Sequence, residues 1–405
     1  MRRTTCVIAG GGPAGAMLAL LLARAGVEVT LLEKHDDFLR DFRGDTIHPS
    51  TLQILDELGL AEEFHRLPHR KAYGMEIHTD DTTVPVANLR RLKSKYQYIA
   101  FVPQWEFLDL LTTAAKRYPN FHLLMETEVL GVIREGDAVR GVRYRDASGE
   151  HELRATLTVA ADGRHSDVRR SAGLVPVEHS APMDVVWFRL PREPEDPGVT
   201  FLRVSSGHMM VSINRETYWQ LAYLIPKGGF ETLRSQGIEA IREPVARLLP
   251  FLGDRVGQLR DFEAVSVLSV VLNRLRRWHR PGLLVIGDAA HAMSPIFGVG
   301  INLAVQDAVA AANLLAEPLA AGAEIPEALL ARVQRRRTPP TAITQFAQRV
   351  VQNRLIRPTL SEHPRQVRLP RDISRLPLIG FLARRFVGFG VLPEHISSPM
   401  KSHQV

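Results

Sequence analysis

The sequence has little cysteine: Cys6 is the only one among 405 residues. A single cysteine excludes an intrachain disulfide and a cysteine-based metal cluster, and it suits a reducing cytoplasm, where we expect the protein to act. The sequence also lacks an uncharged apolar run of about 18 residues, the length that a membrane-spanning helix needs. No cluster of metal ligands is visible. We therefore expect neither a membrane span nor a bound metal.

Charge of one sign does not dominate the chain. There are 51 Lys and Arg residues against 44 Asp and Glu, a formal net charge of +7. The excess forms no basic strip with interleaved aromatic residues, so we expect no nucleic-acid partner. A polyanionic cofactor accounts equally well for a mild basic excess. With 45% hydrophobic and 23% charged residues, the composition is that of a globular protein of two or three structural units.

The N-terminal segment has the pattern of a dinucleotide-binding βαβ unit. The sequence predicts buried strands at Thr5–Ala9 and Val27–Leu32 and a helix at Ala16–Ala25 between them. The turn has the spacing Gly-x-Gly-x-x-Gly, which allows a tight turn, close approach of a pyrophosphate and close packing of helix and strand. A carboxylate after the second strand would bind ribose hydroxyls. The candidate cofactor residues in this unit are Gly10, Gly12, Pro13, Ala14, Gly15, Glu33 and Lys34.

Two later segments also have the pattern of a turn between a buried strand and a helix. Asp162-Gly163 follows a strand predicted at Leu157–Ala161. Another turn follows a strand predicted at Leu283–Ile286 and leads to a helix at Leu303–Leu315. There a carboxylate would bind sugar-like hydroxyls, and a helix N-terminus would stabilise negative charge on a ring. The candidate residues of this third turn are Gly287, Asp288, Pro295, Gly298, Val299, Gly300, Ile301 and Asn302.

The middle of the chain has the pattern of an antiparallel sheet. Four β-rich runs lie between Met183 and Ile225, separated by segments rich in proline, glycine, serine and asparagine. Val265–Leu272 alternates as well and is predicted to lead back to the first unit. We therefore expect an α/β fold with a discontinuous dinucleotide-binding domain, an inserted β-rich substrate domain and a C-terminal helical region. The predicted bounds are 1–72 with 98–180 and 275–325, 73–97 with 181–274, and 326–405.

The three turns, in this order and spacing, resemble the group A flavoprotein monooxygenases, the para-hydroxybenzoate hydroxylase family, over residues 4–315. The resemblance implies a Rossmann-like FAD domain of the glutathione-reductase type with an inserted antiparallel domain. It also implies non-covalent FAD and NAD(P)H as co-substrate, with Asp162-Gly163 serving both and Gly287-Asp288 holding the ribityl chain. By position, Arg43 resembles the family's arginine near the flavin. Gln104, which opens a predicted helix, resembles the glutamine at the ribityl–phosphate region.

The resemblance also implies a mechanism in which the cofactor carries the redox chemistry. NAD(P)H reduces FAD, O2 adds to give a flavin C4a-hydroperoxide, and the distal oxygen hydroxylates or epoxidises an aromatic or polyketide-like small molecule. The protein excludes water and orients the substrate. No protein nucleophile is required, and Pro295, Gly298 and Gly300 would form the environment of the flavin ring.

We expect the substrate to bind between the flavin and the inserted sheet. In Thr217–Ile225 the odd positions are largely apolar, and this face either lines the substrate or packs in the core. Arg189 either pairs with an anionic substrate or is solvated. No set of tyrosine and arginine residues matches the phenol-binding residues of the family, so the substrate stays open. The candidate substrate residues are Trp187, Arg189, His208, Met210, Trp219, Gln220 and Tyr223.

Other functions remain open from the sequence. A flavin-dependent reductase or dehydrogenase would share these motifs. A halogenase would carry Trp-x-Trp-x-Ile-Pro, and Leu221–Pro226 ends in Ile-Pro but lacks both tryptophans. A non-catalytic nucleotide-binding module would have no need of the flavin-ring turn. The sequence decides neither the oligomeric state nor the choice between NADH and NADPH.

The apolar and basic segment Leu376–Leu392 has two interpretations. It either contacts a membrane surface or packs against the body of the protein. Its glycines and short length favour packing.

Overall fold

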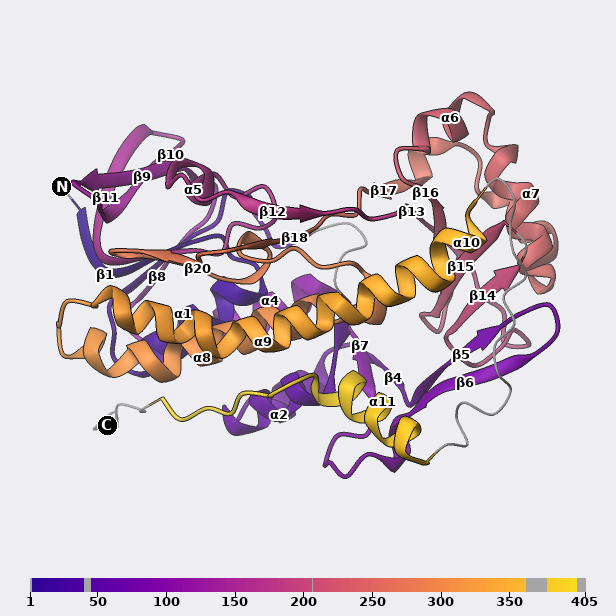
Figure 1. Ribbon diagram of the computed structural model, residues 1–405, viewed down its shortest axis with the longest axis horizontal. Helices are drawn as coiled ribbons and strands as arrows, with labels where there is room; N and C mark the ends of the chain where they lie inside the picture. The colour runs from indigo at the N-terminus through magenta and orange to yellow at the C-terminus, as the bar shows by residue number, and fades with distance from the viewer. Residues whose placement is uncertain (1, 40–44, 206, 362–376, 399–405) are drawn as a thin grey trace.

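The strands that precede the three predicted turns belong to an eight-stranded sheet at one end of an elongated molecule (Figure 1). The computed structural model describes residues 2–39, 45–205, 207–361 and 377–398. The sheet has the order β19-β20-β11-β1-β2-β8, and β10 and β9 extend it from β11. Strands β20, β11, β1, β2 and β8 are parallel, as the βαβ pattern predicts. The strands are β1 (Arg2–Ala9), β2 (Val29–Leu32), β8 (Phe121–Leu124), β9 (Glu128–Glu135), β10 (Ala138–Asp146), β11 (Gly149–Ala160), β19 (His279–Arg280) and β20 (Leu283–Val285).

Apolar helices cover one face of this sheet. α1 (Pro13–Arg24), α4 (Gln104–Ala115) and α8 (Gly300–Ala320) share one buried core with β1 and β2, and α9 (Glu327–Val351) lies on α8. The stretch Ile296–Ala320 is long and apolar enough to cross a membrane, but 83% of its most apolar window is buried inside the protein. It therefore has the character of a core helix, because its apolar side chains are already covered by protein.

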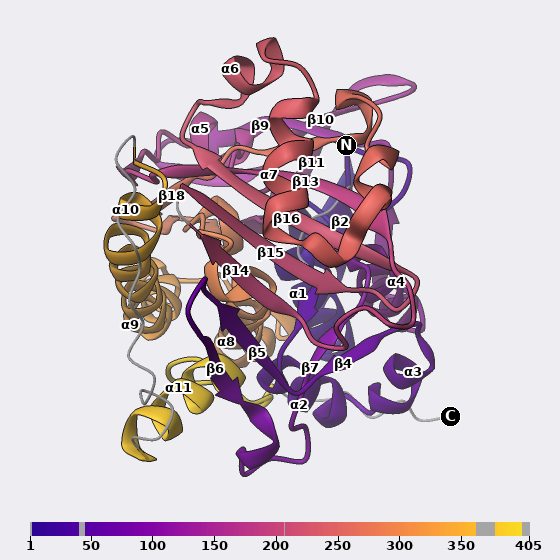
Figure 2. The ribbon, with the colours of Figure 1, turned by 90° about the vertical axis from the view of Figure 1, so that its right-hand side faces the viewer.

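A seven-stranded, mainly antiparallel sheet forms the other end of the molecule (Figure 2). Its order is β17-β13-β16-β15-β14-β5-β6. Its strands are β5 (Gly74–His78), β6 (Thr83–Asn88), β13 (Met183–Pro191), β14 (Phe201–Ser205), β15 (His208–Asn214), β16 (Tyr218–Pro226) and β17 (Ser266–Leu268). Helices α6 (Phe230–Ser235) and α7 (Glu239–Leu248) cover its outer face. Neither is among the predicted elements. α7 contains Pro244, a residue that disfavours a helix interior, and α6 has 6 residues and no buried side chain.

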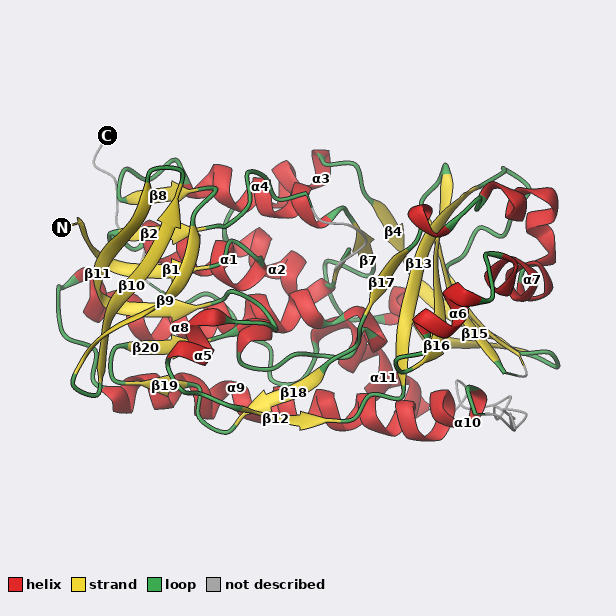
Figure 3. Cartoon of the chain, turned by 90° about the horizontal axis from the view of Figure 1, so that it is seen from above, coloured by secondary structure: helices red, strands yellow, loops and turns green. Residues whose placement is uncertain are grey.

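Two smaller sheets lie between the large ones (Figure 3). One contains β3 (Thr46–Ile47), β7 (Ile99–Phe101) and β4 (Arg70–Ala72), and the other contains β12 (Pro176–His179) and β18 (Leu272–Leu275). The alternating segment Val265–Leu272 is divided between two strands. β17 pairs with β13 in the second sheet, and the chain leaves that sheet before β18 pairs with β12.

The remaining α-helices lie around these layers. They are α2 (Pro49–Glu57), α3 (Ala61–Arg66), α5 (Asp167–Ser171), α10 (Arg357–Thr359) and α11 (Pro377–Phe389). The helical region predicted after Pro326 is α9, which contains Pro339 and Pro340 and continues into a π-helical turn. α11 comes from the apolar C-terminal segment and packs against α2 and β6, while Phe381 and Leu382 stay exposed.

Candidate functional site

The three predicted turns meet at one edge of the first sheet. β1, β11 and β20 are parallel neighbours whose last residues are paired in register, so the segments that follow them leave the sheet at the same edge. A Cβ atom on Gly10 would lie 2.7 Å from the Cα atom of Asp162. A Cβ atom on Gly287 would lie 3.0 Å from the Cβ atom of Ala14. The first turn therefore contacts both of the others.

The first turn leaves the open approach that a pyrophosphate needs. Gly10 has a φ of +99°, and a Cβ atom on it would lie 2.5 Å from the carbonyl oxygen of Ala161, so only glycine fits. A Cβ atom on Gly12, by contrast, would meet nothing within 4 Å. Gly12 caps α1, whose first residue is Pro13. Free N–H groups and the helix dipole favour a phosphate at this end of the helix.

Glu33 lies beside this turn at the end of β2. Its side-chain oxygen Oε2 accepts a hydrogen bond from the N–H of Gly11 at 2.8 Å, and Oε1 accepts one from the N–H of His35 at 3.2 Å. Glu33 is buried and the neighbouring Lys34 is exposed. The carboxylate predicted to bind ribose is thus fixed against the glycine turn.

The second turn is organised by its carboxylate. Asp162 accepts hydrogen bonds from the Ser166 hydroxyl at 2.5 Å and from the N–H of Val168 at 3.1 Å. Burial raises the pKa of Asp162, although both hydrogen bonds act in the opposite direction. Gly163 has a φ of +82°, and a Cβ atom on it would meet nothing within 4 Å. The side chain of Asp162 therefore shapes the turn, and the open side lies at Gly163.

The third turn is held from behind by Asp307 of α8. Its Oδ2 atom accepts a hydrogen bond from the N–H of Gly287 at 3.1 Å and lies 2.5 Å from Nε2 of His291. Its Oδ1 atom accepts one from Nε of Arg337 on α9 at 2.9 Å. Burial by itself raises the pKa of Asp307, but His291 and Arg337 outweigh burial and hold the pKa below its usual value. Asp288 lies on the exposed side of the turn.

The predicted flavin-ring turn, Pro295–Gly298, has a strained backbone. Phe297 has a φ of +71°, which residues other than glycine rarely adopt. The Thr46 hydroxyl donates a hydrogen bond to the carbonyl oxygen of Gly298 at 2.7 Å, and Nε2 of Gln348 donates one to that of Ile296 at 3.0 Å. A strained conformation persists only where surrounding contacts fix it, and it is common at functional sites.

Asn302 connects this turn to the segment before α2. Its Oδ1 atom accepts hydrogen bonds from the N–H of His48 at 3.0 Å and the hydroxyl of Thr51 at 2.7 Å. Its Nδ2 atom donates one to the carbonyl oxygen of Thr46 at 3.3 Å. The side chain of Asn302 thus serves the protein scaffold. The neighbouring predicted residues Val299, Gly300 and Ile301 form the start of α8.

Two further predicted flavin contacts have different outcomes. Arg43 lies outside the described residues. Gln104 is the first residue of α4, as predicted. Two residues after Arg43, Asp45 forms an ion pair with Arg215 in the turn between β15 and β16, and Nε of Arg215 donates a hydrogen bond to Oε1 of Gln220 at 2.8 Å. Burial raises the pKa of Asp45 more than these neighbours lower it. The pair links the segment before β3 of the small three-stranded sheet to the turn between β15 and β16 of the second large sheet.

The predicted substrate residues are divided between the two faces of the second sheet. Met210, Trp219 and Tyr223 lie in the core beneath α7, and Nδ1 of His208 shares a 2.7 Å hydrogen bond with the Tyr223 hydroxyl. The sequence left open whether this face lines the substrate or packs in the core, and in the structure Met210, Trp219 and Tyr223 are core residues. Side chains alternate along a strand, and this face packs on α7, away from the first sheet (Figure 1).

The inner face carries the other three predicted substrate residues, Trp187, Arg189 and Gln220. Nε1 of Trp187 is buried and has no hydrogen-bond partner among the described residues, so its capacity to donate a hydrogen bond is not used by them. Arg189 lies over the ring of Tyr218, 5.1 Å from its centroid. Partly exposed apolar side chains gather here, including one from the flavin-ring turn. They are Ile77, Trp187, Leu202, Val211, Leu268, Ile296, Leu355 and Leu360.

Sequence reasoning placed Asp307 after the third turn but gave it no role, and it did not find the other residues that support the turns from outside. Asp307 follows Gly300 by two helical turns, and this spacing is the signal that could have placed it near the third turn. Arg337 and Thr46 come from distant segments without a motif, and only the folded chain brings them to the turns.

Comparison with known proteins agrees with the family resemblance seen in the sequence, and the agreement covers most of the chain. A family model described as FAD binding domain matches residues 3–351. The 6-methylpretetramide 4-monooxygenase of Streptomyces rimosus is 35% identical over 387 residues, which cover 94% of this chain and 91% of that protein.

Two solved structures show the same fold. PqsL, a probable FAD-dependent monooxygenase from Pseudomonas aeruginosa, superposes with a TM-score of 0.75 at 23% identity, over 87% of this chain and 97% of that chain. The anhydrotetracycline hydroxylase OxyS from Streptomyces rimosus gives a TM-score of 0.73 at 22% identity, over 95% of this chain and 76% of that chain.

Proposed function

The chain belongs to the FAD binding domain family and is a FAD-dependent monooxygenase, and from this premise we propose that it hydroxylates an aromatic, polyketide-like small molecule with O2 and NAD(P)H. The observation that carries the proposal is the position of the flavin-ring turn opposite the apolar inner face of the second sheet, at Trp187. The 35% identical relative is named for a pretetramide, which supports a fused-ring substrate.

The residues at the sheet edge fit FAD. When bound, FAD supplies the redox chemistry, accepting electrons from the nicotinamide and activating O2. The open side of Gly12 and the N-terminus of α1 would bind the pyrophosphate. Glu33 would bind the ribose hydroxyls, and Asp288 the ribityl chain. Asp307 keeps the Gly287 N–H and the turn behind Asp288 in place.

The inner face would bind and orient the substrate. Its apolar side chains cover fused rings and exclude water from the reacting atoms. Nε1 of Trp187 would donate a hydrogen bond to a substrate oxygen and so set its orientation. Arg189, at the exposed end of the same face, would attract an anionic group.

The test is a substrate screen with the purified, FAD-loaded protein. Fused-ring phenols are supplied with NADH or NADPH under labelled O2, and NAD(P)H consumption and product mass are recorded together. We expect substrate-stimulated NAD(P)H consumption and a product heavier by one labelled oxygen atom. Reduction of every active substrate without oxygen incorporation would identify a reductase instead, and a product formed only with chloride or bromide would identify a halogenase.

A further inference from the structure

The C-terminal segment 386–398 reaches the flavin-ring turn through α11. The ring of Phe386 packs edge-to-face on the ring of Phe297, with centroids 5.6 Å apart and an interplanar angle of 85°. Nδ1 of His48 lies 2.6 Å from the carbonyl oxygen of Val387, within hydrogen-bond distance. Phe297 is the strained residue of the ring turn, so the end of α11 contacts the residue that most needs support.

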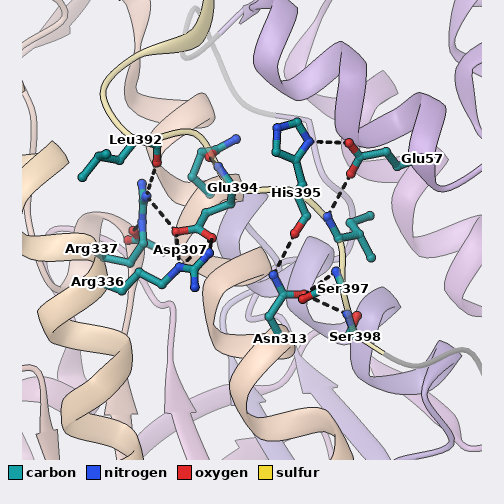
Figure 4. Close-up of polar contacts among 12 residues, drawn as sticks. Glu57, Asp307, Asn313, Arg336, Arg337, Leu392, Glu394, His395, Ser397 and Ser398 are labelled. Carbon is teal, nitrogen blue, oxygen red and sulfur yellow. Dashed lines mark hydrogen bonds and ion pairs between the residues drawn. The ribbon is translucent and has the colours of Figure 1, made fainter.

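The rest of this segment, residues 391–398, is an extended strap that is anchored at Glu394 (Figure 4). The Glu394 side chain is 2% exposed and accepts hydrogen bonds at 2.8 Å from Nε of Arg336. One of its oxygens lies 3.4 Å from Nη1 of Arg337. The backbone N–H of Glu394 also donates a hydrogen bond to the side chain of Gln306, the residue before Asp307.

The strap is connected to the third cofactor turn by a series of contacts between buried charged side chains. Glu394 contacts Arg337, Arg337 contacts Asp307, and Asp307 accepts the hydrogen bond from the N–H of Gly287. Arg337 is 1% exposed and Asp307 is fully buried. Charges buried this deeply need every partner. A change at Glu394 therefore alters the position of Asp307 at the other end of this series of contacts.

We propose that segment 386–398 is part of the cofactor site, with Phe386 and Glu394 as positioning residues for FAD. Phe386 holds the ring turn, and Glu394 holds the Gly287 turn through Arg337 and Asp307. The inference rests on the proposed function only in placing FAD at these turns.

The far end of the strap offers a matched control. Asn313 of α8 binds the carbonyl oxygen of His395 at 2.8 Å and the N–H groups of Ser397 and Ser398 at 2.8 and 2.9 Å. These contacts lie apart from the Arg337–Asp307 pair (Figure 4). Asn313→Ala therefore loosens the strap and leaves the contacts from Glu394 through Arg337 to Asp307 intact.

The experiment measures the FAD dissociation constant of the full chain by flavin fluorescence, for the wild type and for Glu394→Gln, Phe386→Ala and Asn313→Ala. Thermal unfolding of each apoprotein shows whether it is folded, and the visible circular dichroism of bound flavin reports the position of the ring. We expect Glu394→Gln and Phe386→Ala to raise the dissociation constant about tenfold, because small displacements of a binding group are costly. Phe386→Ala also changes the flavin dichroism, and Asn313→Ala stays within a factor of two.

A dissociation constant within a factor of two of wild type for Glu394→Gln or Phe386→Ala would overturn the inference. An equal increase in Asn313→Ala would overturn it as well, because simple tethering of the tail would then suffice. If Glu394→Gln does not fold, Phe386→Ala decides, since the ring of Phe386 is only half-buried. A wild type that binds FAD and yields no oxygenated product contradicts the proposed function and leaves this result standing.

Discussion

A Cβ atom on Gly15 would lie 2.0 Å from the carbonyl oxygen of Gly10, so the two ends of the first turn are in direct contact. Gly12, between them, has open space on its side-chain side. Glycines of one motif therefore serve two purposes, since Gly15 is needed to close the turn and Gly12 leaves space for a ligand.

Substitution of these two glycines by alanine should separate folding from cofactor binding. Gly12→Ala places a methyl group where the pyrophosphate would approach, and Gly12 has an ordinary φ of −68°. We expect its apoprotein to unfold at the wild-type temperature and its FAD dissociation constant to rise at least tenfold. Gly15→Ala should instead destabilise the apoprotein, by about 1–3 kcal/mol or more, because the turn must open. Thermal unfolding and FAD titration of both variants provide the check, and equal apoprotein stabilities would contradict it.

The two faces of the second sheet give a matched pair of tryptophans. Trp187→Phe removes an N–H on the inner face that has no hydrogen-bond partner within the described part of the chain. We expect unchanged or higher stability, unchanged FAD binding and a KM for the aromatic substrate raised roughly tenfold, the effect of losing one hydrogen bond to a ligand.

Trp219→Phe should behave in the opposite way. The Nε1 atom of Trp219 donates a hydrogen bond to Asp196 at 2.8 Å in the core beneath α7. Its loss leaves a buried carboxylate with one partner fewer and should cost about 1–3 kcal/mol of unfolding free energy, with KM unchanged. Denaturant unfolding and steady-state kinetics of the two variants test the assignment of faces, which fails if Trp219→Phe is the variant that changes KM.

The buried ring of His48 should make stability depend on pH. Burial lowers the pKa of His48 from 6.5 to about 4. Between these values the unfolded chain binds a proton that the folded protein does not, so the free energy of unfolding falls as the pH is lowered from 6.5 to 4. The loss reaches about 3 kcal/mol at the lower end.

Denaturant unfolding at pH 7 and pH 4.5 measures this loss. We expect His48→Gln to show a smaller difference between the two pH values than the wild type. His122→Gln, at an exposed histidine, should keep the full difference. The assignment to His48 is wrong if both variants retain it.

The sequence predicts the parallel sheet and its three turns because each is a local pattern. Gly10, Gly12 and Gly15 follow a short apolar strand, and their spacing alone carries the geometry of the turn. The bounds of the helices and strands are also close to prediction where the apolar period is regular, as in α4.

The substrate face is less predictable, because alternation along a strand identifies two faces without saying what covers each. Trp219 and Tyr223 share an apolar face, but only the unpredicted helix α7 shows that this face is core. The partners of Asp307 are equally hidden from local patterns, since Arg337 meets it from α9 and is itself paired with Glu394 of the strap.

The strap also has a consequence for biosynthesis. Glu394 follows Gly287 at a long distance along the sequence, and its contacts to α9 complete the support of the turn that begins at Gly287. A ribosome delivers this turn before the strap, and contacts between such distant segments form slowly. The flavin cradle therefore stays unfinished in a nascent chain until the strap has been synthesised and has reached α9, and full retention of the flavin follows that step.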